Sequence, residues 1–198
     1  MPPLSMHKRQ FLSTLKDCRA LFHHCLNPRG EHSDSGIEAS FLQLFKGWES
    51  FLEDCTLSYM CGRLRCDGTS LKSYSVSMAE EWARKVLYQE RHYVEWTQVD
   101  KVIERWDALF LSPNPLSSSL RSAKAHLEYM KDVRNVIAHS SPKSQENFNS
   151  RIRSTFGGNR RLHRAAPFLS DRMPSDQSNT FFDYYADILE TLAGKVAG

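Results

Sequence analysis

Apolar residues recur at three- and four-residue spacings along most of the chain, which is the pattern of helices that bury one face. Turn and capping residues such as Asn27, Gly30 and Asp34 separate the successive apolar series. The helices that this pattern predicts cover about residues 5–26, 36–63, 78–90, 97–110, 120–140 and 180–196. No strand-like alternation of useful length is present. The sequence therefore predicts an all-α fold, a helical bundle.

The stretch from Pro142 to Asn179 lacks this periodicity and is rich in Ser, Asn, Gly and Arg. It predicts a long Arg-rich loop over about 142–179, with one short helix, before the C-terminal helix. Loops of this length are uncommon in compact domains and are often functional. We expect a single helical domain over residues 1–198, with core helices over about 5–140 and 180–196.

Composition narrows the class of protein. Of the 198 residues, 40% are hydrophobic and 25% are charged, which is typical of a soluble globular protein. No apolar run is long enough for a transmembrane helix, and the N-terminus lacks the apolar core of a secretory signal. We therefore expect a cytoplasmic protein with no membrane association.

The cysteines and tryptophans have structural explanations. The five cysteines include no CxxC pair, so we expect free thiols in a reducing compartment and no metal site. No cofactor-binding motif is present either. The tryptophans lie at helical spacing among apolar residues, which predicts core packing. They are Trp48, Trp82, Trp96 and Trp106.

Positive charge is concentrated in the C-terminal half. Residues 1–110 carry 14 Lys and Arg against 15 Asp and Glu, whereas residues 111–198 carry 12 against 8. An anionic partner would therefore meet the C-terminal half of the chain.

The candidate chemistry lies in the segment Arg134-Asn135-Val136-Ile137-Ala138-His139, at the end of a predicted helix. Asn135 and His139 are four residues apart and share a face, while Arg134 and His139 differ by about 140° around an ideal helix. The long Arg side chain can bridge that offset. An imidazole can act as general base or acid near neutral pH, and a guanidinium can clamp a phosphate. This pair suits cleavage of a phosphodiester through an adjacent 2′-hydroxyl. The alternative is an ordinary helix end, where the macrodipole favours a histidine.

This motif, on a late helix of an all-helical chain, resembles the signature of the HEPN superfamily. That signature is an Arg, four to six residues, then a His, often with a polar residue such as Asn135 directly after the Arg. An earlier long helix centred on Trp48-Glu49 and the connector from Tyr93 to Pro115 are similar to stand-alone prokaryotic HEPN proteins related to the RiboL-PSP group. The resemblance covers roughly residues 5–140.

The resemblance implies a homodimer in which two Arg/His pairs meet across the two-fold axis and form one metal-independent endoribonuclease site. It makes His139 the general base or acid, Arg134 the phosphate clamp and Asn135 a polar orienting residue. Glu49 corresponds to an acidic residue on an earlier helix, although a solvent-facing role is the plain alternative. Toxins of this family that pair with nucleotidyltransferases often carry a modified Tyr where this chain has Ser141. We therefore expect control by an antitoxin or another regulatory protein that occludes the cleft, or by another trigger.

A second feature is an Arg-rich stretch over residues 151–172, in which only Asp171 opposes six arginines. Arginine suits phosphate and base-stacking contacts, so this stretch predicts RNA binding. A solvated loop with internal salt bridges is the alternative. The residues assigned to RNA are Arg151, Arg153, Arg160, Arg161 and Arg164. Three phenylalanines interleave with them, and these could stack on bases or anchor the stretch to the core. They are Phe148, Phe156 and Phe168.

These features lead to one principal hypothesis of function and two alternatives. The principal one is a metal-independent endoribonuclease that acts as a toxin or antiviral defence effector. One alternative is a non-catalytic HEPN module that binds RNA, a nucleotide or a protein partner. The other is a helical interaction or regulatory protein whose Arg/His pair is incidental.

Overall fold

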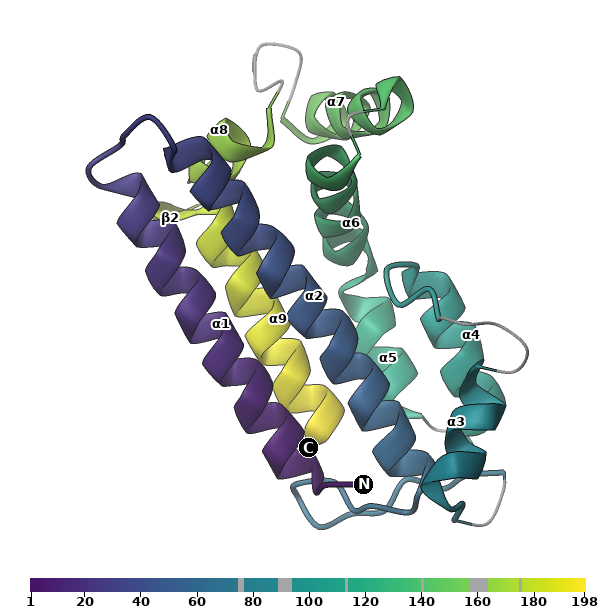
Figure 1. Cartoon of the computed structure of the whole chain (residues 1–198). Helices are drawn as coiled ribbons and strands as arrows, with labels where there is room; N and C mark the ends of the chain where they lie inside the picture. The colour runs from purple at the N-terminus through teal and green to yellow at the C-terminus, as the bar shows by residue number, and fades with distance from the viewer. Residues whose placement is uncertain (75–76, 89–93, 113, 140, 157–163, 175) are drawn as a thin grey trace. The chain divides into compact units, whose positions relative to one another are not determined.

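The structure is a computed structural model that describes the chain except residues 75–76, 89–93, 113, 140, 157–163 and 175. It is 73% helix and 5% strand, which confirms the all-α prediction. The elements are α1 (Leu4–Leu26), α2 (Ser33–Met60), α3 (Glu80–Tyr88), α4 (Val99–Leu109), α5 (Pro115–Ser122), α6 (Lys124–Ala138), α7 (Pro142–Phe156), α8 (Ala165–Ser170), β1 (Arg172–Met173), β2 (Asp176–Thr180) and α9 (Phe181–Ala197) (Figure 1).

The predicted helix over 120–140 is two helices. α5 begins at Pro115, which fits the first helical position because proline has no N–H to leave unbonded there. The side chain of Asn114 caps this helix by accepting the N–H of Leu116 at 3.0 Å. The chain then leaves the helical path at Ala123 (φ −107°, ψ 7°), and α6 starts one residue later.

The prediction of a long loop over 142–179 is wrong for its first part, because residues 142–156 form α7. Among the side chains of α7 that the structure describes, only Phe148 and Ile152, four residues apart, are apolar and buried, and so narrow a stripe is not revealed by periodicity. A proline cannot continue a helix but fits the start of one, and Pro142 occupies the first turn of α7. Further on, α8 and a small antiparallel pair, β1 with β2, replace more of the expected loop.

The chain divides into two compact units. The first comprises Met1–Ser13, Gly47–Lys124 and Leu189–Gly198, and the second comprises Thr14–Lys46 and Ala125–Ile188. The long helices α1, α2 and α9 each contribute residues to both units.

The core of the first unit is aromatic. Phe11 of α1 packs against Trp48 and Phe51 of α2, with ring centroids 5.7 and 5.2 Å apart. The buried Trp106 indole of α4 donates to Thr56 Oγ1 of α2 at 2.8 Å, so its one polar group is satisfied.

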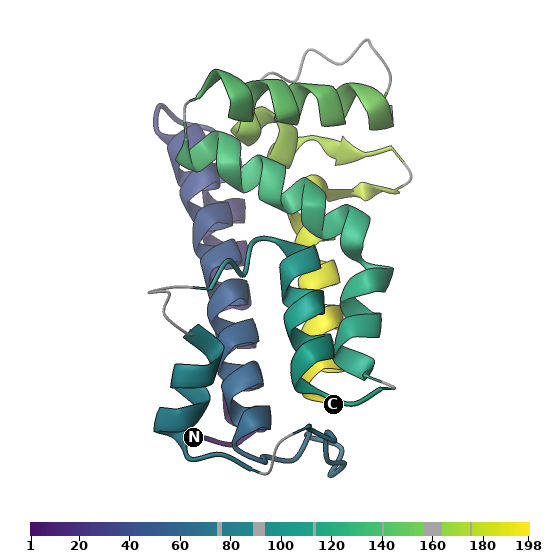
Figure 2. The same cartoon turned by 90° about the vertical axis from the view of Figure 1, so that its right-hand side faces the viewer.

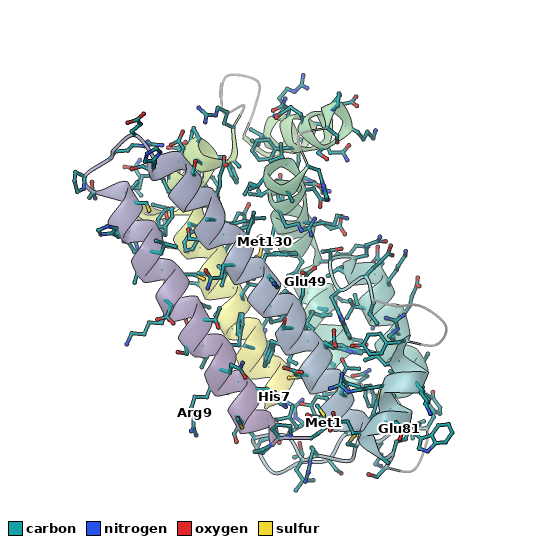
Figure 3. All side chains as sticks on the ribbon, in the orientation of Figure 1. Met1, His7, Arg9, Glu49, Glu81 and Met130 are labelled. Atoms are coloured by element: carbon teal, nitrogen blue, oxygen red, sulfur yellow. The ribbon has the colours of Figure 1, made fainter. Side chains whose placement is uncertain are left out.

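A buried histidine adds a polar tie within the same unit. His7, near the start of α1 (Figure 3), has Nε2 3.2 Å from Ser58 Oγ and Nδ1 3.4 Å from Asp54 Oδ2. Burial raises the pKa of Asp54, and the charge of His7 opposes that rise. These contacts join α1 to α2 within the first unit.

The second unit is also held by aromatic rings. Phe22 of α1 stacks on Phe182 of α9, with centroids 4.2 Å apart and planes 6° from parallel. Phe168 of α8 stacks on Phe181 at 4.4 Å, which ties the segment after α7 to α9.

Three of the four tryptophans are buried as predicted, and the fourth is not. Trp82 is 62% exposed, because α3 buries Ala83 and Leu87 and Trp82 lies beside that stripe. Lys85 lies 4.7 Å from the centre of the Trp82 ring. All five cysteines are free, as expected. In the described part of the chain, no helix has the length and apolar content that a membrane crossing requires.

One prediction follows from this difference in burial. Trp106→Ala should lower the free energy of unfolding by about 3–5 kcal/mol, because it leaves a large cavity and removes the indole N–H that Thr56 Oγ1 accepts. Trp82→Ala is the matched control and should change it by less than about 0.5 kcal/mol. Urea denaturation followed by circular dichroism measures both, and equal losses would contradict the burial of Trp106.

Candidate functional site

The candidate site lies where α6 ends. Met130 and Val133 are buried and anchor α6 to the second unit, which leaves Arg134 and Asn135 half-buried. His139 is exposed and directly follows the last helical residue. Its backbone N–H donates to the Asn135 carbonyl at 2.9 Å, so the chain keeps a helical path up to the histidine.

The structure brings Arg134, Asn135 and His139 together. Arg134 Nη1 donates to Asn135 Oδ1 at 3.2 Å and lies 3.1 Å from His139 Nε2. A guanidinium has only donors, so Nε2 accepts in this contact and the ring proton is on Nδ1. An imidazole that accepts a hydrogen bond through Nε2 in this way is the neutral form of the ring.

Part of the Arg134 side chain remains available. Within the described residues, its Nε and Nη2 atoms have no hydrogen-bond partner. These two atoms form the edge of the guanidinium that can bind an oxyanion through two parallel hydrogen bonds. The arrangement can thus hold a phosphate beside an imidazole.

Glu49 is not part of this group of contacts. It lies half-buried on α2 (Figure 3), in the first compact unit, whereas Arg134 and His139 belong to the second. Its assignment as an acidic site residue stays a prediction.

Ser141 has a structural role at the position where the resemblance led us to look for a tyrosine. Its side-chain Oγ accepts the N–H of Ser144 at 3.2 Å, which caps the start of α7. Its own N–H donates to the His139 carbonyl at 2.7 Å. These bonds tie His139 to the start of the next helix.

Arg151 connects α7 to α6, in a cluster that we call the α6–α7 clasp: Glu128, Tyr129, Asp132 and Arg151. Arg151 Nε donates to the buried Asp132 carboxylate at 2.6 Å, and its Nη2 lies 3.5 Å from Glu128 Oε2. The Tyr129 hydroxyl donates to the Arg151 carbonyl at 3.2 Å, and the guanidinium lies 5.3 Å from the Tyr129 ring centre. Figure 2 shows α7 folding back over α6, as these contacts require.

Electrostatics reinforces the clasp. Burial by itself lowers the pKa of Arg151, but the hydrogen bond to Asp132 and the charges of Asp132 and Glu128 outweigh it, and the pKa rises. Burial raises the pKa of Tyr129, so the phenol remains a neutral donor. Sequence reasoning missed the three α6 members. Glu128 and Asp132 share a helix face at four-residue spacing, but nothing local indicates which cation they bind.

The other arginines assigned to RNA are placed differently. Arg153 is exposed and donates only to the Asn149 carbonyl of its own helix, at 3.3 Å, among the described contacts. Arg164 is exposed and lies 3.3 Å from Asp34, which also binds Arg29 at 2.8 Å. Arg160 and Arg161 lie outside the described residues.

Two of the phenylalanines near these arginines are buried. Phe148 of α7 packs edge-on against Phe168 of α8, with centroids 5.6 Å apart. Anchoring to the core, and not base stacking, is therefore their role. The side chain of Phe156 lies outside the described part.

Comparison with protein-family models, curated proteins and solved structures finds no match to this chain. Within the described residues, no three His, Cys, Asp or Glu side chains converge in a way that could hold a metal ion.

The clasp generates a prediction about stability. Arg151→Ala removes the main partner of the buried Asp132 carboxylate, and we expect it to cost about 1–3 kcal/mol of unfolding free energy. The range is below that of a fully buried pair because the Arg151 side chain is 35% exposed. Arg153→Ala is the matched control and should cost less than about 0.5 kcal/mol. Equal effects of the two variants in urea denaturation would show that the clasp contributes nothing.

Proposed function

We propose that this protein is a metal-independent endoribonuclease of the HEPN type. The observation that carries the proposal is the contact of Arg134 with both Asn135 and His139 at an exposed helix end. A cation that can bind phosphate and an imidazole are in one place, and the remaining guanidinium edge has no hydrogen-bond partner among the described residues. The resemblance of the Arg134-to-His139 motif to the HEPN signature adds to this local chemistry.

The proposed reaction is attack of a ribose 2′-hydroxyl on the adjacent phosphorus. His139 accepts the hydroxyl proton, the new P–O bond forms, and the bond to the 5′-oxygen breaks as that oxygen takes up a proton. Arg134 binds the non-bridging oxygens and offsets the negative charge that grows on them in the transition state. The products are a 2′,3′-cyclic phosphate and a 5′-hydroxyl.

The proposal includes a homodimer. One Arg/His pair supplies few groups to bind transition-state charge, and a two-fold axis beside α6 would bring a second pair to the same phosphate. The expected interface includes α6 and residues of α2. In the cell, such an enzyme would act as a cytoplasmic toxin or phage-defence effector, held inactive by an antitoxin or another regulatory protein.

RNA binding in this proposal uses the arginines assigned to RNA other than Arg151. Arg151 belongs to the α6–α7 clasp, so its loss would affect folding before it affected RNA. Arg153, Arg160, Arg161 and Arg164 remain the residues proposed to hold the RNA backbone. They follow the site along the chain and belong to its positively charged half.

Catalysis is tested by two substitutions. Arg134→Ala and His139→Ala should each lower the rate of RNA cleavage by at least about 100-fold, the scale of a lost general base or transition-state cation. Cleavage by the parent protein should persist in EDTA and give 2′,3′-cyclic phosphate ends, detected by mass spectrometry. His24→Ala, an exposed histidine on α1, is the matched control and should cleave normally. A strict requirement for Mg²⁺ or Mn²⁺ would contradict this mechanism.

Assembly gives a further prediction. The protein should sediment as a dimer at micromolar concentration, and its activity per chain should fall on dilution below the dissociation constant. Analytical ultracentrifugation and cleavage assays over the same concentration series measure both. A fully active monomer would contradict a site built from two subunits, while leaving the proposed roles of Arg134 and His139 intact.

The RNA-binding arginines are tested together. Neutralising Arg160, Arg161 and Arg164 should weaken RNA binding and reduce the log–log salt slope by roughly 0.7 per lost phosphate contact on a single strand. The cleavage rate at saturating RNA should change little, because uniform binding does not raise kcat. An unchanged slope would mean that these residues are merely solvated, and a collapsed kcat with intact binding would place one of them in the active site.

A further inference from the structure

The contact between Arg134 and His139 has a chemical consequence for the base. Arg134 Nη1 carries two hydrogens, and its two acceptors are Asn135 Oδ1 at 3.2 Å and His139 Nε2 at 3.1 Å. The lone pair of Nε2 is therefore occupied by an N–H bond. It is the same lone pair that must accept the proton of a 2′-hydroxyl.

The second ring nitrogen offers no alternative. With Nε2 accepting, Nδ1 of the neutral imidazole carries the ring proton and has no free lone pair in the ring plane. While Arg134 Nη1 stays on Nε2, neither nitrogen of His139 can take up a proton. In the observed arrangement, the Nε2 lone pair of His139 is therefore masked by Arg134.

A phosphate can reverse this masking. Hydrogen bonds from a guanidinium to a phosphate oxygen are charge-assisted and roughly twice as strong as bonds to a neutral acceptor, and the imidazole is neutral here. The Nε and Nη2 edge of Arg134 has no partner within the described residues, so a phosphate can bind there first. His139 is exposed, so its ring has room to turn once the guanidinium moves.

We propose that the Arg134–His139 contact is a latch that the substrate phosphate opens: binding of the oxyanion draws the guanidinium off Nε2 and so unmasks the base. This inference rests on the proposed function, since it concerns the same two side chains. It makes the general base competent only when a phosphodiester is in place.

The test uses ¹⁵N-histidine-labelled protein and nuclear magnetic resonance at about pH 8, where an ordinary imidazole is neutral. The His139 signals are identified by their loss in His139→Ala. Without ligand, His139 should show one tautomer, protonated on Nδ1 with a hydrogen-bonded Nε2. Inorganic phosphate should shift the Nε2 resonance in a saturable manner, and sodium chloride at the same ionic strength should not.

Variants separate the latch from general salt effects. Arg134→Ala, and Arg134→Met as a second variant of similar side-chain length, should each show a mixture of tautomers and lose the phosphate-induced shift. Arg9→Ala removes an exposed arginine on α1 (Figure 3) and should keep the full response.

Two outcomes overturn the latch. One is a His139 ring protonated on Nε2 in the resting protein, and the other is a phosphate response that survives in both Arg134 variants. Neither readout needs RNA cleavage. If the latch fails while His139→Ala still abolishes cleavage, only this inference falls. If the latch behaves as expected but no cleavage occurs, the proposed nuclease function falls instead.

Discussion

The turn between α6 and α7 is the constraint on which the candidate site depends. Pro142 cannot continue α6 and instead starts α7, while Ser141 caps that new helix and also bonds back to the His139 carbonyl. The histidine is therefore held at a helix end, exposed, with backbone bonds on both sides. Asp132 then holds α7 against α6. A buried carboxylate needs a partner, and Arg151 of α7 is the cation that bonds to it.

Ion pairs such as the one between Arg151 and Asp132 change how the positive charge of the C-terminal half should be understood. An excess of arginine in the sequence does not give the number of arginines that can meet a ligand. Arg151 is committed to two carboxylates of α6, and Arg164 shares Asp34 with Arg29. An exposed pair such as Arg164 with Asp34 contributes little to stability and can be exchanged for a phosphate, whereas the clasp cannot be opened without exposing Asp132.

Local periodicity predicts the long helices because α1, α2 and α9 each bury a broad apolar stripe. It fails for α7, where Phe148 and Ile152 are the buried apolar residues among the described side chains, and for Trp82, which lies one position off the buried face of α3. The closeness of Arg134 and His139 is predictable, since five residues of helix set their offset. The clasp is not, because Arg151 meets Asp132 from 19 residues away and only the fold decides that pairing.

In the proposed latch, a polar and uncharged residue beside the arginine, here Asn135, has a specific role. An amide oxygen gives the guanidinium a defined resting position, with Nη1 shared between Asn135 and His139. A carboxylate at that position would bind Arg134 through charge-assisted bonds and compete with the phosphate for the same donors. An apolar residue would give the guanidinium no hydrogen-bond acceptor. Binding of each substrate would then carry the entropic cost of ordering the Arg134 side chain. In the latch that we propose, a neutral acceptor lies between these limits: it would position the cation in the resting state and yield it to a stronger anion.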